Sequence, residues 1–185
     1  MKRSDLEHIL RASKGLTGES EFIVLGSQSI LGLHPDAPRE LRNSMEADLY
    51  PKHRPDLSPL LEGSLGELSL FHSTFGYYAD GVSPGTATLS MGWQERLIPL
   101  CNENTNGATG WCLEPHDLAY SKLAARREKD IAFVAALIRH KLVRPSRLEG
   151  LIRSTPDPDL RAKLNEALRS CRSRVDRPGG DGPRN

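Results

Sequence analysis

The chain of 185 residues carries 25 Lys and Arg against 24 Asp and Glu, a formal net charge of +1 at pH 7, and 37% hydrophobic residues. This length can bury a core without help from metals or disulfides, and the balanced charge provides no overall field that would recruit nucleic acid or a membrane. The three cysteines lack CxxC spacing, no apolar run approaches the roughly 20 residues that span a bilayer, and the start MKRSDLEHIL lacks the apolar segment of a secretory signal. We therefore expect a cytoplasmic protein with no membrane partner.

The chain opens with short elements separated by turns. Helical spacing of apolar residues in SDLEHILRAS (4–13) predicts an N-terminal helix, and the apolar run EFIVLG (21–26) predicts a buried strand. The following SQSILGL (27–33) is expected to open a short helix. The Pro-bearing stretch HPDAPRELRN (34–43) is expected to be a loop or a broken helix.

Four further segments in the first half are predicted to be strands. Strict alternation in SMEADLYP (44–51) indicates a strand with one apolar face, ended by its Pro. YYADGV (77–82), TATLSM (86–91) and QERLIPL (94–100) are predicted as three more. The polar stretch NENTNGATG (102–110) is expected to be a mobile loop.

The character of the sequence changes at Pro115. Helix formers dominate 116–143, with Ile131, Val134, Leu137 and Ile138 as an apolar stripe, and further helices are predicted at 145–154 and 157–175. The result is an α+β fold, a small mixed sheet with flanking helices followed by a helical half. Its predicted division is an α+β domain over 1–114, a helical region over 115–174 and a disordered tail over 175–185.

Two acids on the predicted strand at 44–51 are the first candidates for chemistry. Glu46 and Asp48 are two residues apart, so their side chains leave the same face, about 7 Å apart at the backbone. Carboxylates this close repel each other, and a divalent cation such as magnesium removes the conflict. Most acid pairs of this spacing lie on solvated strand faces, so the pair alone favours a plain surface over a metal site.

Gly26 and Ser27 stand where an apolar strand gives way to a short helix. A glycine lets a phosphate approach the backbone, and the first amides of a helix and the Ser hydroxyl supply hydrogen-bond donors. An isolated Gly-Ser is most often a simple turn. The order strand, Gly-Ser, helix, loop and acid-x-acid strand is far more restrictive.

This order resembles the nucleotidyltransferase superfamily of polymerase-beta type, whose signature is an apolar residue, Gly, Gly or Ser, then an acid-apolar-acid strand and a third acid on a later strand. LGS and MEADL match that signature in the first half of the chain. The segment from 116 is similar to bacterial nucleotidyltransferases of abortive-infection and toxin–antitoxin systems. There an Asp-Leu opens a helix, a Lys follows on it and a Lys-Asp pair starts the next helix. Here these are Asp117-Leu118, Lys122 and Lys129-Asp130.

The resemblance implies transfer of a nucleotidyl group from a nucleoside triphosphate to a hydroxyl of RNA, protein or a small molecule, with Mg²⁺ as cofactor and a partner protein of a toxin–antitoxin pair. It implies three catalytic metal ligands, Glu46, Asp48 and Asp80. Asp80 is preferred to Glu67 as the third acid because it lies on an apparent strand just before a Gly; the alternative is a turn cap. The resemblance further implies nucleotide-binding roles for Gly26, Ser27, Lys122 and Lys129.

Two departures from the family pattern keep alternatives open. Glu46 stands where many active members have Asp, and the stretch between Ser27 and Glu46 is long. A degenerate member that binds or regulates without turnover is therefore one alternative, and a plain structural domain is another. We interpret Arg126 and Arg127 as a solvated helix face.

Overall fold

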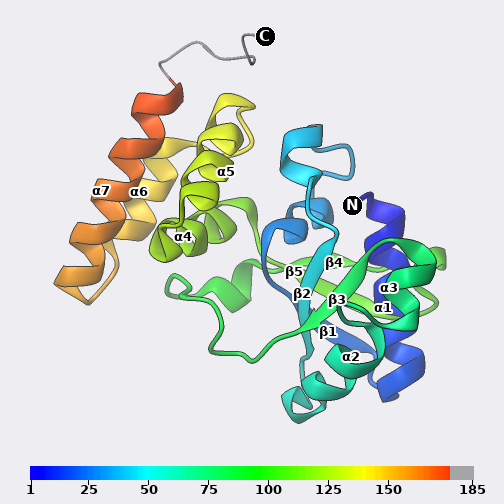
Figure 1. Cartoon of the computed structure of the whole chain (residues 1–185). Coiled ribbons are helices and arrows are strands. Elements are labelled where there is room, and N and C mark those ends of the chain that lie inside the picture. The colour runs from blue at the N-terminus through cyan, green and yellow to red at the C-terminus, as the bar shows by residue number, and fades with distance from the viewer. Residues whose placement is uncertain (176–185) are drawn as a thin grey trace, which may run out of the picture.

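The sheet is built around β1 (Glu21–Val24), which lies in the middle of the strand order β3-β2-β1-β5-β4 in the computed structural model, and the structure describes residues 1–175. The other strands are β2 (Glu46–Pro51), β3 (Tyr78–Gly81), β4 (Ile98–Leu100) and β5 (Thr109–Cys112). Neighbours pair β2–β3 and β1–β5 in parallel and β1–β2 and β4–β5 antiparallel, so the sheet is mixed. With its flanking helices and helical second half, the chain has the predicted α+β class (Figure 1).

Helices α1, α2 and α3 pack beside this sheet. Their bounds, with those of the 3₁₀ helices of the same half, are α1 (Arg3–Thr17), α2 (Ser58–Leu65), α3 (Leu70–Phe75), η1 (Ser27–Gly32), η2 (Arg39–Arg42), η3 (Pro55–Leu57), η4 (Trp93–Arg96) and η5 (Glu103–Thr105). Leu6, Ile9 and Leu10 of α1 are fully buried at helical spacing. A Cβ at Gly110 of β5 would lie 2.7 Å from Leu10 Cδ1, so glycine allows α1 to pack directly on the sheet.

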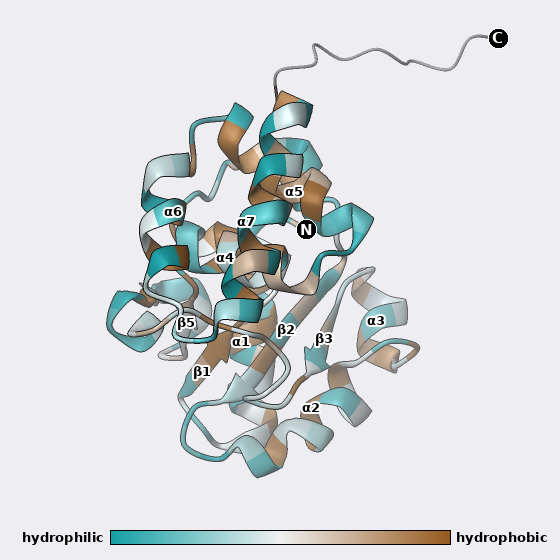
Figure 2. Cartoon of the chain, turned by 90° about the vertical axis from the view of Figure 1, so that its left-hand side faces the viewer, coloured by the Kyte–Doolittle hydropathy of each residue, from teal (hydrophilic) through white to brown (hydrophobic). Residues whose placement is uncertain are grey.

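The second half is a bundle of four helices: α4 (Pro115–Ala125), α5 (Glu128–Arg139), α6 (Pro145–Arg153) and α7 (Pro158–Val175). The α4 helix contacts the other three, and α5 also packs on η2. Arg126 ends α4 in the left-handed conformation, with φ of 58°, and its N–H bonds Lys122 O. The predicted stripe of Ile131, Val134 and Leu137 is buried. In Figure 2 α5 carries hydrophobic colour, whereas α6 and α7 are largely hydrophilic outside.

Two predictions about the segment between β3 and β5 are wrong. Residues 86–91 are not a strand but a loop, whose Ala87 and Leu89 pack against the core instead of alternating across a sheet. The stretch 102–110 is not a free loop either. It forms η5, tied to α1 because Asn102 and Asn104 donate to the Glu7 carboxylate, and it then enters β5.

The predicted strand at 94–100 is present only as β4, after the turn of η4. Pro99 is tolerated there because β4 is an edge strand. The predicted tail lies, beyond Val175, outside the described residues. Of the helices described in residues 1–175, none combines the length and apolar character that crossing a membrane requires.

Candidate active site

Three carboxylates meet on one face of the sheet where β2 and β3 run side by side. Asp48 and Asp80 are Cα partners in this parallel pair, so their side chains leave the sheet on the same side. Glu46 precedes Asp48 by two residues and shares that face. One carboxylate oxygen of each acid lies within 4.8 Å of the others, a spacing that one metal ion could bridge. The rival third acid, Glu67, is exposed in the turn after α2 and lies outside this cluster.

The cluster is electrostatically crowded as long as it holds no cation. Burial, and after it the charge of Glu46, raises the pKa of Asp48 from its ordinary 3.8 to about 7. Burial, followed by the hydrogen bond and charge of Glu62, raises the pKa of Asp80 to about 6. A divalent cation relieves such repulsion, and carboxylate oxygens are the ligands that magnesium prefers. The donor set therefore fits the expected Mg²⁺.

Hydrogen bonds hold the backbone and side chain of Glu46, and the backbone next to Asp80, in position. The Tyr78 hydroxyl donates to Glu46 Oε2 at 3.3 Å, and burial together with the charge of Glu46 raises the pKa of Tyr78 to about 12. The Glu46 N–H donates to Ser44 Oγ at 3.0 Å. Glu62 of α2 accepts the N–H of Gly81 at 3.0 Å. Sequence reasoning missed Glu62, because nothing in the spacing along the chain connects α2 with the end of β3.

Gly26 gives the cluster its space. Its φ of 59° and ψ of −174° form a combination that essentially only glycine adopts. A Cβ at this position would lie 1.7 Å from Asp48 Oδ2, so any side chain here would displace that carboxylate. Ser27 follows at the start of η1, where its Oγ accepts from Gln28 Nε2 at 3.3 Å. The Gly-Ser pair thus borders the acids directly, as its order along the chain suggested.

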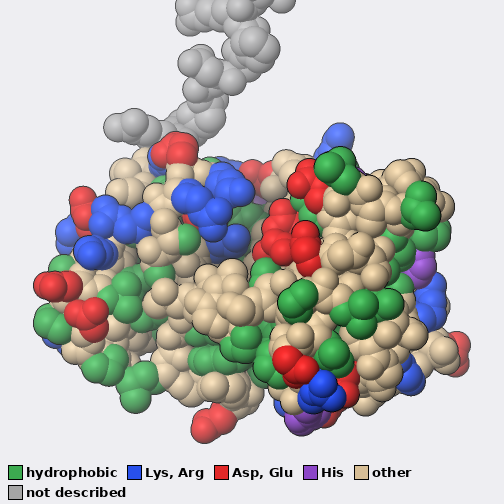
Figure 3. All heavy atoms as spheres, turned by 60° about the horizontal axis from the view of Figure 1, so that its bottom comes forward, with side chains coloured by type: hydrophobic (Ala, Val, Ile, Leu, Met, Phe, Trp, Pro, Cys, Tyr) green, Lys and Arg blue, Asp and Glu red, His purple; other side chains and the backbone are tan. Residues whose placement is uncertain are grey.

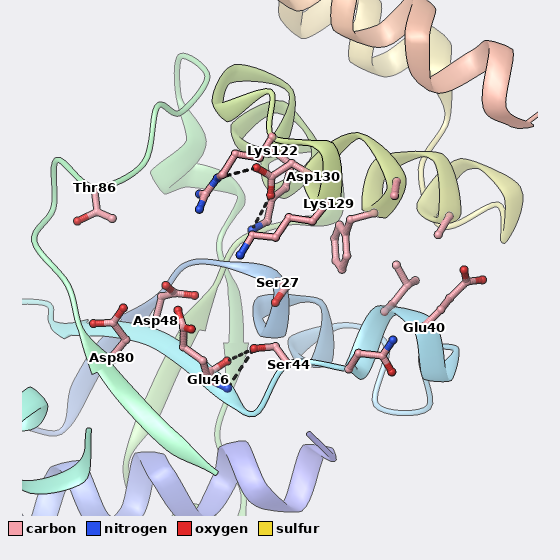
Figure 4. Close-up of a pocket in the computed structure, with 16 residues that line it drawn as sticks. Ser27, Glu40, Ser44, Glu46, Asp48, Asp80, Thr86, Lys122, Lys129 and Asp130 are labelled. Atoms are coloured by element: carbon pink, nitrogen blue, oxygen red, sulfur yellow. Dashed lines mark hydrogen bonds and ion pairs between the residues drawn. The ribbon is translucent and has the colours of Figure 1, made fainter. Parts of the chain in front are cut away.

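Basic side chains face the acids from the helical half. Figure 4 shows Lys122, Lys129 and Asp130 on one side of the cleft and Glu46, Asp48 and Asp80 on the other. The buried Asp130 carboxylate binds Lys122 Nζ at 3.4 Å and Arg127 Nε at 3.0 Å. Lys129 makes no ion pair within residues 1–175. The side chain of Arg127 is exposed, as the sequence predicted, but its ion pair with the buried Asp130 was not predicted, nor was the clamp that Asp130 thereby forms on Lys122 and Arg127.

A cleft of about 590 Å³ separates these two walls. Figure 3 shows the hollow, with Asp and Glu side chains on one side and Lys and Arg on the other. Six of the seven predicted site residues line it, namely Ser27, Glu46, Asp48, Asp80, Lys122 and Lys129. The seventh, Gly26, lines an adjoining pocket of about 170 Å³ that shares Asp48 and Lys122 with the cleft. The lining of the two adjoining hollows therefore brings together the Gly26–Ser27 turn after β1, the strands β2 and β3, and the helices α4 and α5.

Asp117, part of the helical motif, lies outside this cleft and has a different contact. It is fully buried and accepts from Arg96 Nε at 2.8 Å and from the Ser90 hydroxyl. These bonds hold the loop after β3, which carries Thr86 to the rim of the cleft. Asp117 is thus a positioning residue for that loop.

The crowded acids predict a specific pH dependence of stability. Because the pKa of Asp48 is raised in the folded state, its stabilising contribution is present in full below about pH 4 and is lost as pH rises through about 7. Asp48→Asn should remove this loss. Chemical denaturation without metal measures the free energy of unfolding of both proteins. The advantage of the variant over the wild type should grow by on the order of 2 kcal/mol between pH 4 and pH 8. An advantage that stays constant over this range would contradict the repulsion among the acids.

A family model described as "Nucleotidyltransferase of unknown function (DUF6036)" matches residues 4–167, which includes every residue of the acidic cluster and its basic counterpart. No match was found among curated proteins or among solved structures.

Proposed function

The chain belongs to the DUF6036 family of nucleotidyltransferases, and from this membership and the acidic cluster we propose that it is a magnesium-dependent enzyme that moves a nucleotidyl group from a nucleoside triphosphate to an acceptor hydroxyl. The observation that carries the proposal is the approach of Glu46, Asp48 and Asp80 to within 4.8 Å on one face of β2 and β3. The side chain of Glu46 is longer than that of the Asp common at this position, yet its carboxylate still joins the cluster. This placement of the carboxylate supports an active enzyme over a degenerate one.

Each acid has a role in the proposed reaction. Glu46, Asp48 and Asp80 would hold Mg²⁺, which when bound neutralises charge on the phosphates. In the transfer, the acceptor oxygen bonds to the α-phosphorus, the bond to the bridging oxygen breaks and pyrophosphate leaves. The proton of the acceptor hydroxyl must be removed, and Asp80, which borders the cleft, would accept it.

The basic wall supplies positive charge for the phosphates. Lys122 and Arg127 are oriented by Asp130, and Lys129 is exposed at the cleft. Positioned cations of this kind stabilise the charge of the transferred group and of the pyrophosphate. The Gly26–Ser27 turn adds backbone and hydroxyl donors beside Asp48.

The charge distribution favours RNA over protein or a small molecule as the acceptor. Residues 115–175 carry 14 Lys and Arg against 7 Asp and Glu, whereas residues 1–114 carry 9 against 15. The net charge of the whole chain is close to zero because a basic helical half and an acidic half with the sheet balance each other. A basic body next to the catalytic acids suits a polyanion whose end must reach the cleft.

We propose that the protein acts in the cytoplasm, where nucleoside triphosphates are abundant. From the helical motif we propose that it belongs to a toxin–antitoxin or phage-defence system with a protein partner. Arrested growth on expression, relieved by a neighbouring gene product, would be the corresponding observation.

The proposal is tested by transfer of label. The protein is incubated with each of the four nucleoside triphosphates, labelled at the α-phosphate, with Mg²⁺ or EDTA, and with RNA, protein or small hydroxyl compounds. We expect Mg²⁺-dependent label in RNA that falls steeply with added salt. Metal-dependent nucleotide binding without transfer to any acceptor would instead support the binding and regulatory alternative.

A further inference from the structure

One face of α5 lines the cleft from end to end. Lys129, Ala132, Phe133 and Ala136 recur at helical spacing, and all four border the cleft. The charged member is at the N-terminal end of α5, near the acids, and the apolar members follow. Ala132 is exposed, Phe133 is half-buried with part of its ring against the core, and Ala136 is buried, so this part of the face runs from solvent to the floor of the cleft.

The opposite wall of this apolar part comes from η2 and the turn before β2. Leu41 is almost fully buried and Asn43 is exposed, and both border the cleft. The Asn43 side chain makes no hydrogen bond within residues 1–175. An aromatic ring, aliphatic side chains and an amide therefore border the same part of the cleft, which we term the slot (Leu41, Asn43, Ala132, Phe133 and Ala136).

Charged groups lie at both ends of the slot. At the far end Glu40 binds Arg139 Nη2 at 2.6 Å and His140 Nε2 at 2.5 Å, which ties η2 to the end of α5. At the near end Lys122 Nζ lies 5.9 Å from the centre of the Phe133 ring. The apolar slot thus opens directly onto the basic groups assigned above to the phosphates.

Resting on the proposed function, we propose that the slot is the site of the nucleobase. The base would lie against the Phe133 ring, because every base has a π-face that stacks on an aromatic side chain. Its edge would meet the Asn43 amide, which has both a donor and an acceptor and can distinguish one base from another. A base in the slot would leave the phosphates of the same ligand beside Lys122 and the acids, which border the same cleft.

Two probes separate the slot from the phosphate site. Inorganic tripolyphosphate has the charges of the nucleotide but neither base nor sugar, so its binding with Mg²⁺ depends only on the charged part of the cleft. Titration calorimetry should show that Phe133→Leu weakens binding of the nucleoside triphosphates about tenfold and leaves tripolyphosphate unchanged. Asn43→Ala should make the dissociation constants of the four nucleoside triphosphates more alike.

Two further variants show whether an effect of Phe133→Leu comes from the slot or from a disturbed fold. Ala132→Leu adds bulk to an exposed position and should obstruct the slot, with the same selective loss of nucleotide binding. Phe75→Leu makes the matched change in α3, away from the cleft, and should alter neither ligand. Equal weakening of nucleotide and tripolyphosphate by Phe133→Leu, or equal affinity of the wild type for both, overturns the slot while leaving the proposed function standing. Binding of neither probe overturns both.

Discussion

Asp48→Asn should reduce nucleotidyl transfer by at least about 100-fold and abolish stabilisation by Mg²⁺. Asp48 is the middle acid of the cluster, flanked by Glu46 on its own strand and by Asp80 across the parallel ladder. An Asn side chain has the same shape but carries no charge, so it cannot balance a divalent cation. The apoprotein should be as stable as the wild type or more stable at pH 8, because the substitution removes repulsion. Initial transfer rates, Mg²⁺ titration and thermal unfolding measure the three effects.

Asp56→Asn is the matched control for this variant. Asp56 forms an exposed ion pair with Arg54 at 2.7 Å, neither residue lines the cleft, and such pairs contribute little to stability. Transfer by this control should equal that of the wild type. Retention of transfer by Asp48→Asn would remove the cluster from the mechanism. Loss of transfer accompanied by unfolding of the apoprotein would assign Asp48 to the fold instead.

The acid pair was predictable because a strand has a period of two, which is a local property of the sequence. The third acid depended on a contact that local patterns do not contain. Asp80 and Glu67 were both reasonable until the parallel pairing of β2 with β3 placed Asp80 opposite Asp48. Pairing partners and register are set by the whole sheet, so the choice between the two acids required the fold.

Local patterns failed where packing decided the structure. Residues 86–91 alternate like a strand, yet their polar Ser90 is held by the buried Asp117 and their apolar residues pack inward from a loop. The strand β5, which pairs with the central β1, was missed because it contains Gly110, a residue that weakens strands. That glycine is present because Leu10 of α1 occupies the space of its side chain.

The basic wall was only half predictable for a similar reason. Arg127 follows the left-handed turn at Arg126, which redirects the chain so that Arg127 and Asp130 meet Lys122. A helical-wheel argument assumes that no such turn occurs. Phe133 could have been noticed, since it is off the buried stripe of Ile131, Val134 and Leu137. An aromatic residue away from the core face of a helix is a candidate for ligand contact.

Asp130→Asn tests whether the clamp serves catalysis as well as folding. The Asp130 side chain is 2% exposed and holds two cations, Lys122 and Arg127. Its loss leaves both without their partner, and removal of one member of a buried ion pair costs several kcal/mol. Because Asn can retain part of the hydrogen bonding, we expect a loss of about 2 kcal/mol in the free energy of unfolding. Lys122 and Arg127 should also lose their orientation toward the triphosphate, raising KM about tenfold.

A second variant distinguishes the two roles of Asp130. Glu166→Gln breaks the ion pair of Arg126, the arginine next to Arg127, but that pair is exposed on α7 and should change neither stability nor KM appreciably. Steady-state kinetics with varied triphosphate, alongside chemical denaturation, measures both quantities for the two variants. If Asp130→Asn lowers stability while KM stays at the wild-type value, the clamp only joins α4 to α5. A rise in KM that tripolyphosphate binding reproduces places its effect at the phosphates, because that probe carries neither base nor sugar.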